Sequence, residues 1–170
     1  MPSIPRFLPG RIDRRHHFAQ EFIVWSMASI HALHLRHTPT PDDLPRVTRL
    51  WAQLGWGQDD EDGRRRVSLA FAGSAWIALA DWEGEFAGYA RALSDGVLVT
   101  YLVEVAVAPS CRRKGVGGAL IQSCLDAFQH TAVYADAAPE IIGLNTRYGL
   151  LPRPSHLTAC ARGPRTVAAT

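Results

Sequence analysis

The segment from residue 108 to residue 119 combines small, basic and helix-forming residue types in an order that can bind an anion. A predicted strand stops at a proline, three adjacent cations follow, and a glycine-rich turn then leads into a predicted helix. The first N–H groups of a helix have no partner within the helix, and they attract anions. Neighbouring arginine and lysine side chains add charge-assisted hydrogen bonds. We therefore predict a pyrophosphate site built from Arg112, Arg113, Lys114, Gly115, Val116, Gly117, Gly118 and Ala119.

The spacing of this segment excludes two common phosphate-binding loops. A Walker A loop needs its lysine after the last glycine, whereas Lys114 precedes Gly115. The dinucleotide-binding fingerprint needs Gly-x-Gly-x-x-Gly directly after a strand, and the glycines here are spaced differently. The pattern that fits is Arg-x-x-Gly-x-Gly, formed by Arg112, Gly115 and Gly117. It resembles the acyl-CoA signature of the GNAT superfamily of N-acetyltransferases. The alternative is a solvated basic turn at the start of an ordinary helix.

Composition and charge indicate one globular domain. The chain has 170 residues, of which 47% are hydrophobic and 20% are charged. The net charge of +2 is too small to favour nucleic acid as the main partner. The three cysteines, Cys111, Cys124 and Cys160, have neither metal-ligand nor redox spacing, so we expect no metal and a reducing, cytoplasmic setting. No apolar run is long enough to cross a membrane, and no membrane partner is expected.

Residues 1–30 differ in character from the rest of the chain. Their prolines and glycine disfavour regular structure, and a basic stretch follows at residues 11–17. We expect a disordered tail or a start codon assigned too early, with the folded domain at residues 31–170. A nucleic-acid-binding arm at residues 6–17 is a remote alternative.

The hydrophobic pattern of the remainder predicts alternating strands and helices. Strands are expected at 34–38, 76–80, 86–93, 98–108, 132–135 and 156–162, and helices at 41–54, 116–128 and 139–148. Thr40 is the predicted N-cap of the first helix, and residues 58–66 are expected to form a charged loop or short helix. Over residues 33–162 this order also resembles the GNAT fold. That resemblance implies an α/β (α+β type) architecture, in which flanking helices cover a mixed central sheet whose fourth and fifth strands splay apart.

The resemblance further implies how an acyl donor binds and reacts. The pantetheine arm of acetyl-CoA would lie between the splayed strands and bond to the main chain of Val105, Ala106 and Val107. An N–H near Val105 would face the thioester carbonyl and stabilise its negative charge during attack by an amine. The acetyl group would pass directly to a primary amine of a small molecule in a ternary complex, and a homodimer is possible. Residues 88–96 are most similar to enzymes that acetylate small amines, including arylalkylamines. The competing interpretation is a non-catalytic acyl-CoA-binding or regulatory module.

Four residues are candidates for handling the amine. Glu104 is the only charged residue of its predicted strand, so it either faces the cleft as a proton acceptor or pairs with a buried cation such as Arg91. Trp56 and Tyr89 could line an aromatic pocket, and Asp95 is a second acidic candidate that a Ser-Asp-Gly turn also explains.

The predicted last helix departs from the family pattern at the position of the general acid. Asn145 stands where the family usually has a tyrosine that protonates the leaving CoA thiolate. An amide can donate a hydrogen bond to sulfur but cannot give up a proton. Tyr148 lies three residues further on, about 300° around the helix, and is expected to pack inward.

Overall fold

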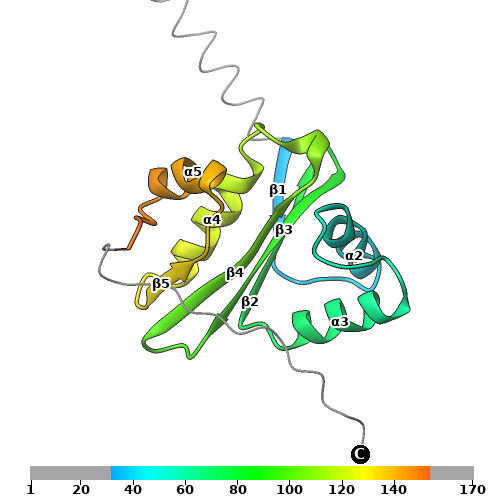
Figure 1. Ribbon diagram of the computed structural model, residues 1–170, viewed down its shortest axis with the longest axis horizontal. Coiled ribbons are helices and arrows are strands. Elements are labelled where there is room, and N and C mark those ends of the chain that lie inside the picture. The colour runs from blue at the N-terminus through cyan, green and yellow to red at the C-terminus, as the bar shows by residue number, and fades with distance from the viewer. Residues whose placement is uncertain (1–31, 154–170) are drawn as a thin grey trace, which may run out of the picture.

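The computed structural model describes residues 32–153, which form a five-stranded sheet with helices on both faces (Figure 1). The strands are β1 (Leu33–Arg36), β2 (Trp76–Trp82), β3 (Glu85–Ser94), β4 (Val99–Val107) and β5 (Ala132–Ala135). The helices are α2 (Asp43–Gln53), α3 (Glu61–Ala72), α4 (Val116–Ala127) and α5 (Ile142–Arg147), with short 3-10 turns η1 (Pro109–Cys111) and η2 (Pro139–Ile141). The strands lie in the order β1-β2-β3-β4-β5, and only β4 and β5 run parallel. The predicted mixed α/β architecture is confirmed.

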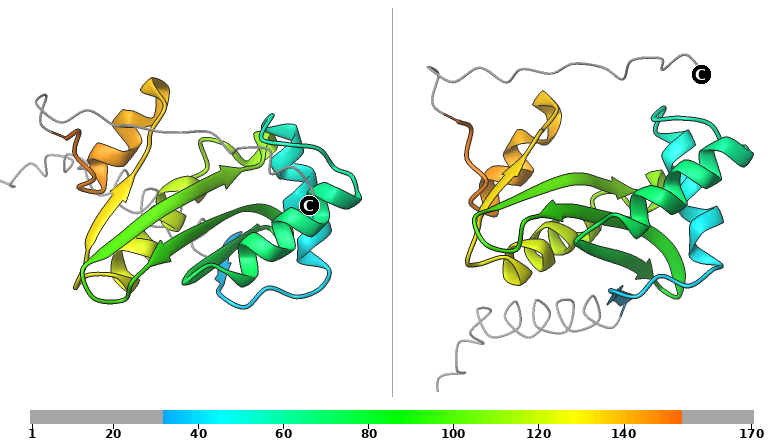
Figure 2. Two further views of the ribbon diagram at one scale, coloured as in Figure 1. Left: turned by 60° about the horizontal axis from the view of Figure 1, so that its bottom comes forward. Right: turned by 90° about the horizontal axis from the view of Figure 1, so that it is seen from below.

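The two helical layers cover opposite faces of the sheet (Figure 2). On one face α4 packs across β2, β3 and β4, and it buries an apolar stripe at Val116, Leu120, Cys124 and Phe128. On the other face α2 and α3 enclose a second core. Its buried residues are Val47, Leu50, Val67, Phe71, Leu79, Tyr89 and Ala106. The sheet is therefore held between two cores.

The strands β4 and β5 separate after four paired residues. Their register begins at Val99 opposite Ala132 and ends at Leu102 opposite Ala135, although β4 continues to Val107. The second half of β4 therefore has no neighbour on that edge among residues 32–153. This separation is the splay that the family resemblance implies, and below it is called the fork.

The prediction of a charged loop or short helix at 58–66 is corrected by the longer helix that residues 61–72 form. They form the twelve-residue helix α3, which begins where the Asp60 carboxylate accepts the N–H of Gly63 at 2.7 Å. Only Val67 and Phe71 bury large side chains from it. Such a narrow apolar stripe within a charged sequence gives a weak helical pattern.

The start of α2 and the length of the last helix also differ from prediction. Thr40 does not cap α2; the carboxylate of Asp43 instead accepts both the N–H and the hydroxyl of Thr40, at 2.7 and 2.8 Å. The same carboxylate pairs with Arg36 of β1, so the helix is tied to the sheet at its first residue. The last helix is split into the 3-10 turn η2 and the shorter α5.

The predictions for residues 1–30, for the arm at 6–17 and for a strand at 156–162 lie outside the described residues, as does Cys160. None of the helices between residues 32 and 153 has the length and apolar character needed to cross a membrane.

Candidate active site

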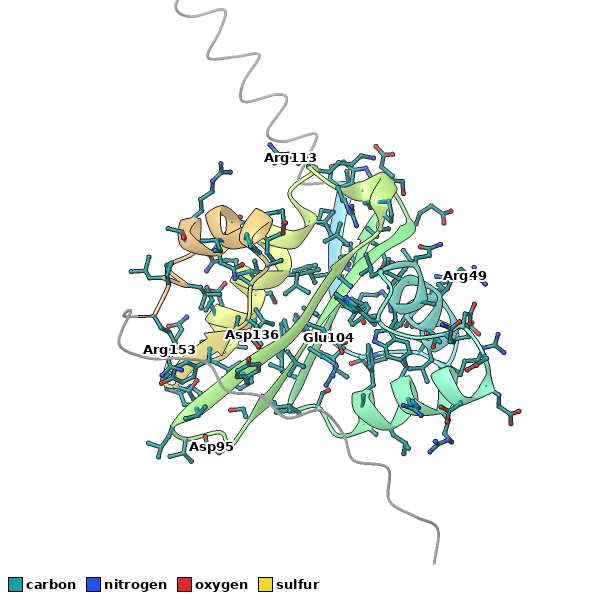
Figure 3. All side chains as sticks on the ribbon, viewed as in Figure 1. Arg49, Asp95, Glu104, Arg113, Asp136 and Arg153 are labelled. Atoms are coloured by element: carbon teal, nitrogen blue, oxygen red, sulfur yellow. The ribbon has the colours of Figure 1, made fainter. Side chains whose placement is uncertain are left out.

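The loop between β4 and α4 has the geometry of an anion site. Gly115 adopts a left-handed φ of 86° and places its carbonyl at the start of α4. No side chain caps this helix end in the described part of the chain, so the N–H groups of Val116, Gly117 and Gly118 are free to bind a ligand. Arg112 and the two cations after it are exposed around this end, and Figure 3 shows Arg113 at the tip of the loop.

One cation of the loop is directed toward the sheet. The ammonium of Lys114 lies 5.3 Å from the centre of the Trp82 ring at the end of β2. This cation–π contact holds Lys114 beside the loop. Cys111, which precedes the cations, is buried in the α4 core, where it fills space.

The open edge of β4 presents main-chain groups to the fork. The N–H of Ala108 donates to Ala87 of β3 at 2.8 Å. Because these directions alternate along a strand, Val105 and Val107 direct their N–H and C=O groups to the opposite edge, where β5 has ended. The main-chain N–H and C=O groups of Ala106 point toward β3, and its carbonyl lies against Gly88. The structure therefore separates Ala106 from the two valines with which the sequence analysis grouped it.

Glu104 lies on the α2 and α3 face of the sheet, and each of its carboxylate oxygens accepts one hydrogen bond. Its carboxylate accepts from the Arg91 guanidinium at 2.9 Å and from the Tyr89 hydroxyl at 3.0 Å. The side chains of Glu104 and Arg91 are 18% and 13% exposed, so the pair is largely shielded from water. Of the two options that the sequence left open, the structure shows the ion pair. Burial and the Glu104 charge raise the pKa of Tyr89 far above its ordinary value, so Tyr89 stays a hydrogen-bond donor.

A bulge in β4 brings a second polar group onto the same face. Arg91 pairs with Glu104 but Ala92 pairs with Leu102, so Val103 is an extra residue in β4. Tyr101 and Glu104 are three residues apart and would otherwise point to opposite faces; the bulge places both on the α2 and α3 face.

Tyr101 joins the two strands at the point where the fork begins. Its hydroxyl donates to Asp136, the residue directly after β5, at 2.5 Å. This hydrogen bond raises the pKa of Tyr101 to about 12. Figure 3 shows Asp136 on the β5 side of the fork and Glu104 on the β4 side. Neither Tyr101 nor Asp136 is among the site residues predicted from the sequence. An acidic residue at the carboxyl end of a strand is a signal that could have pointed to Asp136.

The three predicted pocket residues have different surroundings. Tyr89 has no exposed surface and packs against Phe71, so its ring lines no open pocket. The carboxylate of Asp95 accepts the N–H groups of residues 97, 98 and 99 in the β3–β4 turn, which lowers its pKa. Figure 3 places Asp95 at the far end of the hairpin from Glu104, so its role is structural. Trp56 follows α2 and is 44% exposed.

Asn145 and Tyr148 occupy different surroundings on the last helix. Asn145 is buried, with 8% of its surface exposed. The Tyr148 phenol packs inward over the first turn of α4, where an added Cβ on Gly118 would lie 2.1 Å from the hydroxyl oxygen. Tyr148 therefore lies beside the anion loop rather than at the mouth of the fork.

Comparison with known proteins gives one family. The model of the acetyltransferase (GNAT) family matches residues 35–140. The chain is 25% identical to the chloroplastic serotonin N-acetyltransferase 2 of Oryza sativa subsp. japonica over 134 residues, which are 75% of this chain and 66% of that protein.

Solved structures share the fold. A GNAT family protein of Streptococcus pneumoniae has a TM-score of 0.63 at 17% identity, covering 79% of this chain and 99% of its own. An aminoglycoside N-acetyltransferase in complex with CoA has a TM-score of 0.57 at 20% identity, covering 76% and 94%. These findings confirm the predicted acyltransferase class, and the chain belongs to the acetyltransferase (GNAT) family.

Proposed function

We propose that this protein transfers the acetyl group of acetyl-CoA to a primary amine of a small molecule. The observation that carries the proposal is the joining of an uncapped, cationic helix start to an open strand edge. The first can bind a pyrophosphate, and the second can bind an extended amide chain. CoA contains both groups, connected in one molecule.

The residues present fit such a donor. The helix start offers free N–H groups at Val116, Gly117 and Gly118, and the adjacent cations offset phosphate charge. An added Cβ on Gly117 would lie 3.5 Å from the side chains of both Val107 and Leu144, so this glycine keeps a gap open between β4 and α5. The Tyr148 hydroxyl lies against Gly118 in the first turn of α4, and we propose that it donates to the bound donor.

The reaction that we propose forms one bond and breaks one bond. The amine nitrogen attacks the thioester carbon, the carbon–sulfur bond breaks, and the sulfur leaves with its electron pair. The negative charge that develops on the thioester oxygen is stabilised by the Val105 N–H, which points into the fork. Removing such a donor typically costs roughly 3 kcal/mol of transition-state stabilisation.

The amine must lose a proton, and we propose that Glu104 accepts it, directly or through one water. A carboxylate has about four lone-pair positions, and Arg91 and Tyr89 use two of those on Glu104. The remaining positions are free to take a proton on the side of the fork. Arg91 then also keeps Glu104 in place for this role.

Asn145 supports a slow reaction in which the thiolate leaves without a protein acid. A thiol has a pKa of about 8.5, so a thiolate is a competent leaving group near neutral pH. The same residue is the specific observation that favours the second candidate, a module that binds acyl-CoA without turnover. The serotonin N-acetyltransferase relative supports an arylalkylamine among the acceptors. A cytoplasmic location and a homodimer stay predictions.

The test is a thiol-release assay with acetyl-CoA and a panel of arylalkylamines, polyamines, amino acids and aminoglycosides. We expect release that depends on one amine class, together with the acetylated amine detected by mass spectrometry. Calorimetric binding of CoA without turnover across the panel would favour the binding module. Absence of CoA binding would contradict both.

A further inference from the structure

On the α2 and α3 face, the point where β4 and β5 begin to separate carries a polar group that the proposed reaction does not use. Below, this point is called the entrance to the fork. Tyr101 and Tyr134 are paired in register across β4 and β5, and Asp136 accepts the hydrogen bond from Tyr101. This group of three is called the fork patch. The fork patch shares this face of the sheet with Glu104, so an amine that approaches the fork from this face meets both carboxylates (Figure 3).

Glu104 and Asp136 differ in how many carboxylate oxygens are free of protein hydrogen bonds and can accept one from a ligand. Both oxygens of Glu104 are bonded to protein donors. For Asp136, only Oδ2 accepts a protein hydrogen bond within residues 32–153, and the residue is exposed. Its Oδ1 is therefore available to a ligand that donates N–H groups.

The fork patch already holds one cation of the chain itself. The guanidinium of Arg153 lies 5.1 Å from the centre of the Tyr134 ring. Arg153 makes no salt bridge within 4.0 Å among the described residues, so the aromatic face is its contact here. The patch thus combines a ring that attracts cations with a carboxylate oxygen that is open to solvent.

We infer that Asp136 binds the acceptor amine in its protonated form at the entrance to the fork, and that Tyr101 positions Asp136 for this contact. The inference rests on the proposed function and names the substrate class of the same site: alkylammonium compounds, in preference to nucleophiles that are uncharged at neutral pH. An ammonium group bound there is on the same face of the sheet as Glu104, which we propose receives its proton. Arg153 competes for the same patch.

The test compares benzylamine with phenylhydrazine, in which an uncharged NH replaces the CH2 group. Affinities are measured by calorimetry on the full chain saturated with CoA, so the readout does not depend on turnover. Asp136→Asn should weaken benzylamine binding about tenfold and leave phenylhydrazine binding unchanged. Asp95→Asn is the matched control, since it removes the same charge at the far end of the hairpin and retains the turn.

Two further variants separate recognition from general structure. Tyr101→Phe should weaken benzylamine binding about threefold, and this effect should disappear in the Asp136→Asn background, because the tyrosine acts through the aspartate. Arg153→Ala should tighten benzylamine binding about threefold by removing the competing cation.

The outcomes are distinct for the two proposals. Equal benzylamine affinity in Asp136→Asn and Asp95→Asn, or no benzylamine binding to the wild-type chain, would overturn the role of Asp136. Asp136-dependent binding of benzylamine without thiol release from acetyl-CoA would leave this inference standing and contradict the proposed reaction.

Discussion

Replacing Gly117 by alanine should stabilise the fold and weaken CoA binding at the same time. An added Cβ would lie 3.5 Å from Val107 Cγ2 and from Leu144 Cδ2, which is ordinary van der Waals contact. Glycine within a helix is about 0.5–1 kcal/mol less favourable than alanine. We therefore expect the free energy of unfolding to rise by about 0.5 kcal/mol and Tm by about 2 °C.

The same methyl group fills the gap between β4 and α5 beside the helix start, where we propose that the pyrophosphate of CoA binds. CoA affinity should consequently fall about tenfold, because the main chain of α4 is no longer open to close approach. Thermal unfolding followed by circular dichroism and calorimetric titration with CoA measure the two effects on one sample.

Gly143→Ala is the matched control for this variant. Gly143 is also the second residue of its helix, α5, and an added Cβ there meets no atom within 4 Å. It should raise Tm similarly and leave CoA affinity unchanged. If Gly117→Ala also left CoA affinity unchanged, or lowered Tm, the reasoning about this gap would be refuted.

Three other predictions address the proton path and the scaffold. Glu104→Gln should lower the acetylation rate about 10²-fold below the pKa of the acceptor amine, with recovery at higher pH; a pH–rate profile that superimposes on wild type would assign Glu104 to a structural pair. Asn145→Tyr should raise the rate about tenfold if the helix presents this side chain to the sulfur, whereas an unchanged kcat would show that no acid is needed there. Asp43→Asn should lower the free energy of unfolding by about 1.5 kcal/mol at pH 7, because it weakens one of the two carboxylate contacts of Arg36, which keeps its ion pair with Asp81. Hydrogen bonds from Arg36 hold the pKa of Asp43 below its ordinary 3.8, so the stabilisation is complete above that pH and is lost as the pH falls below it. The difference in Tm between wild type and Asp43→Asn should therefore narrow below pH 3.8, and a constant difference would contradict this assignment.

The sequence predicts the parts of the site that depend on local pattern. Strand β5 has the predicted bounds, 132–135, and the loop from Arg112 to Gly118 has the expected strand–turn–helix setting. Proline, glycine and a run of β-branched residues determine these features over short distances. The splay of β4 from β5 followed from family resemblance rather than from the residues themselves.

The sequence does not predict features that depend on register between strands. The bulge at Val103 cannot be seen in one strand alone, and it decides that Tyr101 shares a face with Glu104. From the sequence, Glu104 could either face the cleft or pair with Arg91, because the register between β3 and β4 decides which residues lie opposite each other. Tyr89 looked like a pocket residue because its burial arises from α3, whose narrow apolar stripe hid the helix.

The measurement that tests the central claim most directly is an amide NMR titration of the full chain with CoA. The account predicts that the N–H signals of Val105 and Val107 shift together with those of Val116, Gly117 and Gly118, while Ala106, whose N–H faces β3, shifts less. Shifts confined to the arginine-rich loop, with none at Val105 and Val107, would show anion binding without a donor in the fork and would contradict the account.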